Sequence, residues 1–250
     1  MYSDNNVIID TSYRSSNCDS RIRHVVLHYT EHSLDRTIAI FKDPTRQVST
    51  HYLVPDTAID GKRVVYQFLQ EKERAWHAGA SSWGHITNLN FSSIGIENVN
   101  LGYKDEGGQR IWHPFSDYQI QTLLELLKPI VDRYHILPVN IVGHSDIAPG
   151  RKLDPGPKFP WKTLYEQGVG AWFDEIALEL RDREVVDIRK LQTDLKIYGY
   201  AIEITGELDA QTRTVLQAFQ MHFRPRDYSG APDVETVAIL ENLISKYFLQ

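Results

Sequence analysis

A short segment rich in proline and glycine, residues 143–157, holds three side chains that together could carry out metal-assisted hydrolysis. His144 follows the apolar run Val139–Val142 after one glycine, and Asp154 lies further along, two residues after Lys152. Histidine and aspartate bind zinc when a rigid scaffold holds them, and lysine supplies positive charge for a developing oxyanion. The segment therefore predicts one side of a metal-dependent site that acts on a substrate.

A catalytic zinc site has three protein ligands and one open position for water, so a third ligand is needed. His28 is the best candidate, because it lies at the end of Ile22–Tyr29, an apolar run typical of a buried central strand. The alternative is a hydrogen-bonded core histidine, the commoner role for a single buried histidine. Two histidines at strand ends, paired with a loop aspartate, favour the metal site.

Hydrolysis also needs a general base near the bound water. Glu97 is the candidate, because it places a charge inside the otherwise apolar strand predicted over 94–99. A solvated or ion-paired carboxylate is the alternative. Gly95 beside it leaves room for a ligand or a backbone segment to approach closely.

Three further residues are candidates for binding substrate: Trp76, His77 and Asn98. Trp76 and His77 precede an alanine and a glycine and could line a groove, although core packing explains Trp76 equally well. His51 is expected to pack in a strand or to lie behind the ligands. The other histidines are expected to be surface or structural residues: His24, His32, His85, His113, His135 and His222.

These side chains require a scaffold of alternating strands and helices, which the first part of the chain predicts. The pattern indicates an α/β domain with a central mixed sheet flanked by helices, and ligands of such domains collect beyond the strand ends. Ser116-x-x-Gln119 is a capping box that starts a long amphipathic helix, in which Pro129 predicts a kink or an early end. The other expected elements are a helix over Ser33–Phe41 and strands over His51–Val54, Arg63–Leu69 and Val139–Val142.

The composition changes after Trp172, where Glu175–Arg183 is charged and suits a linker or a surface helix. Three helical patterns follow, beginning near Asp187, Asp209 and Asp233. A three-helix unit of roughly 65 residues can just fold alone. We therefore expect two domains, residues 1–180 and residues 181–250, of which the second is a small all-α unit.

The bulk composition excludes some classes of function. Of the 250 residues, 42% are apolar and 24% charged, which is ordinary for a globular protein, and the net charge of −6 argues against nucleic-acid binding. A single cysteine, Cys18, leaves no internal disulfide. No apolar run approaches the roughly 20 residues that span a bilayer, and the polar start lacks the pattern of a secretory signal.

Several motifs in order resemble the zinc-dependent N-acetylmuramoyl-L-alanine amidases of the type-2 class, the AmpD and AmiD group. The motifs are VVLHYT at 25–30, STHYLVP at 49–55, RAWHAG at 74–79, NFSSIGIENVN at 90–100 and GHSDIAPGRKLDPGPKFPW at 143–161. The resemblance implies one zinc ion per chain, bound by His28, His144 and Asp154. It also implies that Glu97 is the catalytic glutamate and Lys152 the oxyanion partner.

The implied reaction is hydrolysis of the amide between N-acetylmuramic acid and the L-alanine of the stem peptide, in peptidoglycan or in muropeptides. The C-terminal unit, residues 181–250, resembles a three-helix peptidoglycan-binding domain through motifs that lie between residues 188 and 220. The bacterial cell envelope, and within it the periplasm, is therefore the expected location. The cytoplasm and non-classical export are alternatives, and a homo-oligomer is compatible with the sequence. Deletion of residues 187–250 is expected to spare cleavage of small muropeptides and to weaken action on intact wall.

Two other functions remain open at this point. One is a recognition protein of the same fold that binds peptidoglycan without cutting it, which has no need for a glutamate and a lysine beside three ligands. The other is a zinc peptidase acting on the stem peptide, which the lack of a His-Glu-x-x-His helix disfavours.

Overall fold

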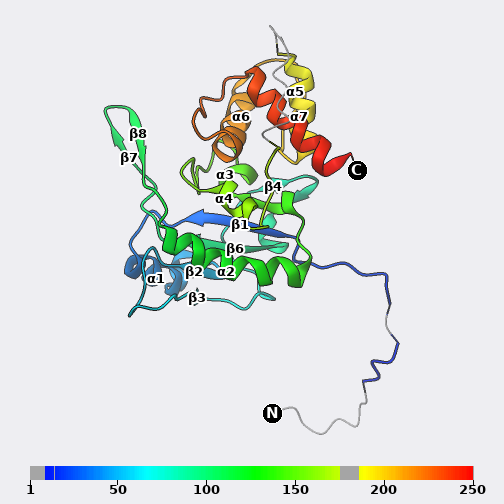
Figure 1. Cartoon of the computed structure of the whole chain (residues 1–250). Coiled ribbons are helices and arrows are strands. Elements are labelled where there is room, and N and C mark those ends of the chain that lie inside the picture. Colours follow the sequence, from blue (N-terminus) through cyan, green and yellow to red (C-terminus); the bar gives the residue numbers. More distant parts are fainter. Residues whose placement is uncertain (1–8, 14, 175–185, 250) are drawn as a thin grey trace.

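A five-stranded mixed sheet lies at the centre of the computed structural model, which describes residues 9–13, 15–174 and 186–249 (Figure 1). The strand order is β3-β2-β6-β1-β9. All neighbours pair in parallel except β3, which is antiparallel to β2. The strands are β1 (His24–Tyr29), β2 (Tyr52–Val54), β3 (Tyr66–Gln67), β6 (Ser93–Asn98) and β9 (Ile141–Gly143). The predicted mixed sheet is confirmed, although the strand expected over Arg63–Leu69 is reduced to the two residues of β3.

The apolar sequence of β1 follows from its place in the middle of this sheet. All six of its residues are buried, between the parallel neighbours β6 and β9. A strand covered on both faces has no polar side, so its sequence is a continuous apolar run. The register pairs His28 with Glu97, and β9 ends immediately before His144. The carboxyl ends of three adjacent strands therefore bring these residues together.

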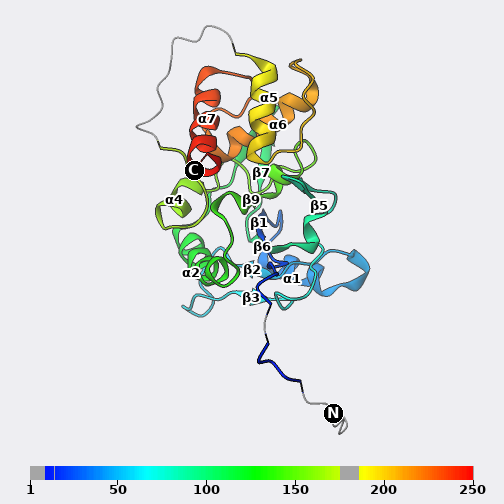
Figure 2. The same cartoon turned by 90° about the vertical axis from the view of Figure 1, so that its right-hand side faces the viewer.

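Helix α2 (Asp117–Tyr134) lies against one face of the sheet (Figures 1 and 2). The Ser116 hydroxyl accepts the Gln119 backbone N–H, as the capping pattern predicts. Of the two outcomes predicted at Pro129, a kink or an early end, the early end is wrong, because the helix continues through Pro129 to Tyr134. Pro129 lies on the exposed side of the helix, where water can hydrate the carbonyl that loses its backbone partner.

The shorter elements surround the sheet and its carboxyl edge. The helices are α1 (Leu34–Lys42), α3 (His144–Ile147) and α4 (Trp161–Glu166), with 3-10 turns at Pro44–Arg46, Leu89–Phe91 and Pro138–Asn140. Two hairpins pair β4 (Ser82–Trp83) with β5 (Ile86–Thr87) and β7 (Tyr103–Glu106) with β8 (Gln109–Trp112). The second hairpin projects from the body of the molecule in Figure 1.

The three predicted C-terminal helices are present as α5 (Ile188–Tyr198), α6 (Ala210–Phe223) and α7 (Val234–Phe248). Each begins at an aspartate whose carboxylate accepts the backbone N–H three residues later, which explains the starts seen in the sequence. The charged segment Glu175–Arg183 and the expected division between residues 180 and 181 lie outside the described residues.

The C-terminal helices share their apolar core with the sheet domain, and we call residues 186–249 the helical unit. The Trp83 ring packs edge-on against Tyr200, and the Trp161 ring stacks on His222 with 3.8 Å between centroids. The two tryptophans and Tyr200 belong to one continuous buried cluster. The sequence suggested a unit that could be deleted without harm to the rest. The structure does not support this expectation, because deletion of the helical unit would remove the apolar side chains that pack on Trp83 and Trp161.

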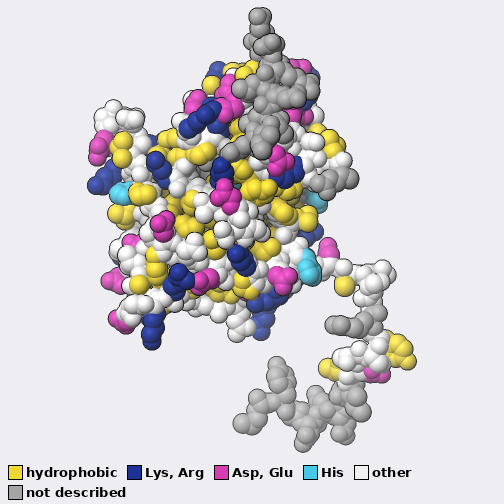
Figure 3. Space-filling model, in the orientation of Figure 1, with side chains coloured by type: hydrophobic (Ala, Val, Ile, Leu, Met, Phe, Trp, Pro, Cys, Tyr) yellow, Lys and Arg dark blue, Asp and Glu magenta, His cyan; other side chains and the backbone are white. Residues whose placement is uncertain are grey.

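On the face shown in Figure 3, acidic and basic side chains are interspersed among apolar ones. The described part of that face carries no continuous basic stripe of the kind that follows a phosphate backbone. The arrangement agrees with the net negative charge of the chain.

The contact between Gly199 and Trp83 provides a test of the shared core. Gly199 has φ of +141°, and a Cβ there would lie 2.7 Å from the Trp83 ring. We expect Gly199→Ala to lower the free energy of unfolding by about 3 kcal/mol, through overpacking and backbone strain together. Urea denaturation measures this loss.

Gly168→Ala is the control, because Gly168 also has positive φ, but a Cβ added there would meet no neighbouring atom within 4 Å. It should lose only about 1 kcal/mol. Equal losses in the two variants would contradict the importance of the contact between Gly199 and Trp83.

Candidate metal centre

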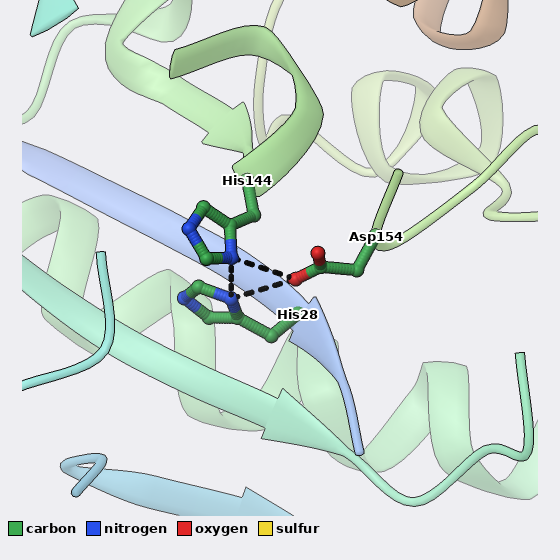
Figure 4. Close-up of side chains that lie close together, drawn as sticks. All are labelled: His28, His144 and Asp154. Carbon is green, nitrogen blue, oxygen red and sulfur yellow. Dashed lines mark hydrogen bonds and ion pairs between the residues drawn. The ribbon is translucent and has the colours of Figure 1, made fainter. Parts of the chain in front are cut away.

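Three buried side chains from separate elements converge on one point, as Figure 4 shows. His28 comes from the end of β1, His144 is the first residue of α3, and Asp154 lies in the loop after α3. The two Nδ1 atoms are 3.0 Å apart, and Asp154 Oδ2 lies 2.8 Å from His28 Nδ1 and 3.0 Å from His144 Nδ1. The three predicted ligands are therefore brought together.

The donor set fits a zinc ion. Two imidazole nitrogens and one carboxylate oxygen are ligands that catalytic zinc sites use, with a further position left for water. The three ligand atoms are buried and lie within 4.8 Å of one another, so a single ion can contact all of them.

The segment 74–79 contacts the Nε2 atoms of both His28 and His144 and so orients their rings. His28 Nε2 lies 2.9 Å from His77 Nδ1, and His77 Nε2 lies 3.2 Å from the Ser93 hydroxyl. His144 Nε2 lies 3.1 Å from the Ala78 carbonyl. If Nδ1 of each ligand binds metal, its Nε2 carries the proton and donates it to these acceptors. These contacts fix the tautomer and the plane of each ligand ring.

Gly95 makes this arrangement possible. A Cβ at this position would lie 2.5 Å from the His77 ring, so no other residue fits without moving that ring. The sequence predicted that Gly95 leaves room for a ligand or a backbone segment. The structure fills that room with an imidazole instead. His51 also lies behind the ligands, where its Nδ1 accepts the Gly95 backbone N–H.

Burial favours the neutral form of two imidazoles at this site, His28 and His77. Desolvation, helped by the neighbouring His144, lowers the pKa of His28 to about 4. Desolvation also holds the pKa of His77 well below its ordinary value, with His28 as the next contribution. For Asp154, burial opposes ionisation, but His144 and the hydrogen bonds from both histidines outweigh it and lower the pKa. Neutral histidines and an ionised aspartate are the protonation states that metal binding requires.

The predicted catalytic residues line the same pocket as the three ligands. Glu97 and Lys152 both border it, and so do Trp76 and His77. Glu97 Oε2 is buried and has no hydrogen-bond partner in the described part of the chain. Burial, with Asp154 as the next contribution, raises the pKa of Glu97 well above its ordinary value. A buried carboxylate with a free oxygen suits a general base.

The three candidates for substrate binding have different surroundings. Trp76 is 50% exposed at the pocket, which favours a groove-lining role over core packing. His77 also borders the pocket, but both of its ring nitrogens are engaged. Asn98 is fully buried and does not line the pocket, because its amide donates to the His28 carbonyl in the sheet. Asn98 therefore supports the end of β1 rather than facing a ligand.

Two contributors to the site were missed in the sequence. The Ala78 carbonyl is a backbone group and leaves no signal in the side-chain pattern. Arg151 donates to the same carbonyl at 2.7 Å and lies 3.3 Å from His144 Nε2. Its position beside Lys152 in the sequence was the available signal.

Residues 19–157 match the N-acetylmuramoyl-L-alanine amidase family, over more than half of the chain. The chain belongs to this family. Residues 185–240 of the amidase match a putative peptidoglycan binding domain. Both resemblances suggested by the sequence motifs are thus confirmed.

The amidase is similar to relatives over nearly its whole length. N-acetylmuramoyl-L-alanine amidase AmiD of Escherichia coli (strain K12) is 44% identical over 246 residues, which cover 96% of this chain and 88% of AmiD. A structure of E. coli AmiD with the substrate anhydro-N-acetylmuramic acid-L-Ala-D-gamma-Glu-L-Lys superposes with a TM-score of 0.90, covering 96% of this chain and 95% of that one. AmpDH3 from Pseudomonas aeruginosa superposes with a TM-score of 0.88 at 41% identity, covering 96% and 99%.

These matches confirm the predicted fold and the predicted enzyme class, over the alternative of a protein that only binds peptidoglycan. They extend through the C-terminal helices as well as the sheet. Among the described residues, no helix is long and apolar enough to cross a membrane.

The raised pKa of Glu97 predicts a stability effect with a definite sign. Below its unfolded-state pKa, Glu97 is protonated in both states, so its ionisation does not change the free energy of unfolding. Above its folded-state pKa, burial of the charge destabilises the folded protein. In metal-free protein, Glu97→Gln should therefore stabilise the fold more at pH 8 than at pH 5. Urea denaturation with a chelator at both pH values measures this difference, and a pH-independent effect would contradict it.

Proposed function

We propose that this amidase hydrolyses the amide between the lactyl group of N-acetylmuramic acid and the L-alanine of the stem peptide, using one zinc ion per chain. His28, His144 and Asp154 hold the ion. The observation that carries the proposal is the convergence of these buried donors in one pocket with Glu97 and Lys152. When bound, zinc supplies an acidified water and polarises the substrate carbonyl.

Glu97 acts as the general base and then as the general acid. It accepts a proton from the attacking water and transfers it to the amine that leaves. Its buried position supports both steps, because a raised pKa makes the carboxylate a stronger base and lets it hold the proton.

Lys152 stabilises the negative charge that develops on the carbonyl oxygen. Its side chain is exposed and borders the pocket, so it can approach a bound substrate from the loop that also carries Asp154. A donor placed at a developing oxyanion contributes on the order of 3 kcal/mol to the transition state in comparable sites.

The substrate class follows from the relatives and from the pocket. AmiD and AmpDH3 were solved with anhydromuramyl peptides bound, which supports muropeptides as substrates of this chain. The exposed indole of Trp76 offers an apolar surface at the pocket for the muramyl or peptide part. The peptidoglycan-binding-like helices support polymeric wall as a substrate and the cell envelope, in particular the periplasm, as the location.

Three substitutions separate metal binding from chemistry. His144→Ala should abolish both bound zinc and activity, since it removes a ligand. Glu97→Ala should keep zinc and lower kcat by about 10²- to 10⁴-fold, and Lys152→Ala should keep zinc and lower kcat by about 10²-fold. Elemental analysis of the purified protein and amide hydrolysis of a muramyl peptide are the measurements. Full activity in Glu97→Ala would disprove the assigned mechanism.

The choice between polymer and fragment is tested with the full-length chain. Mass spectrometry of products from intact sacculi and from isolated anhydromuropeptides should show free stem peptides from both. Release from fragments alone would limit the enzyme to recycling and would contradict a role on polymeric wall.

A further inference from the structure

The turn that carries His144 is held by an aspartate whose other partners come from the helical unit. Asp146, in α3, is 1% exposed. Its Oδ2 accepts the Gly143 backbone N–H at 2.7 Å and His222 Nδ1 at 2.8 Å, and its Oδ1 accepts the Tyr200 hydroxyl at 2.7 Å. Two of the three hydrogen bonds to this buried carboxylate therefore come from residues far away in the sequence.

A buried carboxylate is stable only when its oxygens are hydrogen-bonded. Removing a donor would leave Asp146 underpaired, and α3 would have to move toward other partners or water. The Trp161 ring stacks on His222, with an angle of 14° between the planes, and so restricts the donor. The position of the Asp146 carboxylate therefore depends on two residues of the helical unit, Tyr200 and His222.

The turn transmits this constraint to both loop ligands. Gly143 and Asp146 flank His144, so the hydrogen bond between them closes the turn around the ligand. The Ser145 backbone N–H donates to the Asp154 carbonyl at 2.8 Å. A Cβ on Gly143 would lie 2.6 Å from the Pro155 side chain, so the segment around Gly143 packs closely against the segment around Asp154. Movement of α3 would therefore displace His144 and Asp154 together.

We propose that the helical unit is a structural part of the metal centre, in which Tyr200 and His222 are positioning residues. They hold Asp146, which in turn holds the turn bearing His144 and, through it, Asp154. This role is separate from any binding of peptidoglycan by the helices. It rests on the proposed function only in requiring that His28, His144 and Asp154 bind a metal.

Tyr200→Phe tests the proposal with the loss of one hydroxyl. Zinc affinity, measured by competition with a chromogenic chelator, should fall about 10-fold, as it does when groups behind metal ligands are removed. The visible absorption spectrum of the cobalt-substituted protein should also change, because it reports the arrangement of the ligands. His222→Phe, which retains a ring against Trp161 but removes the donor, should act in the same direction.

Tyr247→Phe is the matched control. The Tyr247 hydroxyl also joins the helical unit to the rest of the protein, through hydrogen bonds of 3.2 Å to the backbone N–H and carbonyl of Trp172, away from Asp146. It should lower stability to urea by a similar amount to Tyr200→Phe, but leave zinc affinity and the cobalt spectrum unchanged.

Two different results would contradict the two proposals. If Tyr200→Phe and His222→Phe match the wild type and Tyr247→Phe in zinc affinity and cobalt spectrum, the helical unit only adds stability and the inference is overturned. If the wild-type chain itself binds no zinc, the metal centre of the proposed function fails instead. The wild-type measurement therefore distinguishes the two failures.

Discussion

The structure depends on one electrostatic constraint, the meeting of His28, His144 and Asp154 with donor atoms 2.8–3.0 Å apart inside the protein. Burial alone would disfavour a charged aspartate there, so its ionised form depends on the two histidines that contact it. The parallel pairing of β1 with β9 brings the two histidines together, because it ends both histidine-bearing segments at the same edge of the sheet. The site is then a consequence of the strand order.

Two separate parts of the chain support the ligands. The segment 74–79 places His77 and the Ala78 carbonyl beside the Nε2 atoms of the two histidines. Asp146 accepts the Gly143 backbone N–H and so closes the turn that carries His144. A catalytic metal needs ligands that are rigid before the substrate arrives, and this double support provides that rigidity.

The helical unit has two features that matter in this arrangement. Its sequence matches a putative peptidoglycan binding domain, and its inner face completes the core of the catalytic part. Trp83, Trp161 and Trp172 each pack their ring against a ring of this unit. The same hydrophobic effect that folds each part therefore also holds the two parts together.

The sequence by itself determined the central strands and the starts of the C-terminal helices, and it singled out the three buried side chains that meet beside Glu97 in one pocket. These features are local: β1 is a continuous apolar run, Glu97 interrupts another, and an aspartate begins each helix. Only the tertiary structure decided the rest. In the folded protein the Asn98 amide donates to the His28 carbonyl, and His77 Nδ1 lies within hydrogen-bonding distance of His28 Nε2. Tyr200 and His222 hydrogen-bond to Asp146. Contacts between residues far apart in the chain leave no periodic pattern, because their geometry is set by packing after the elements have formed.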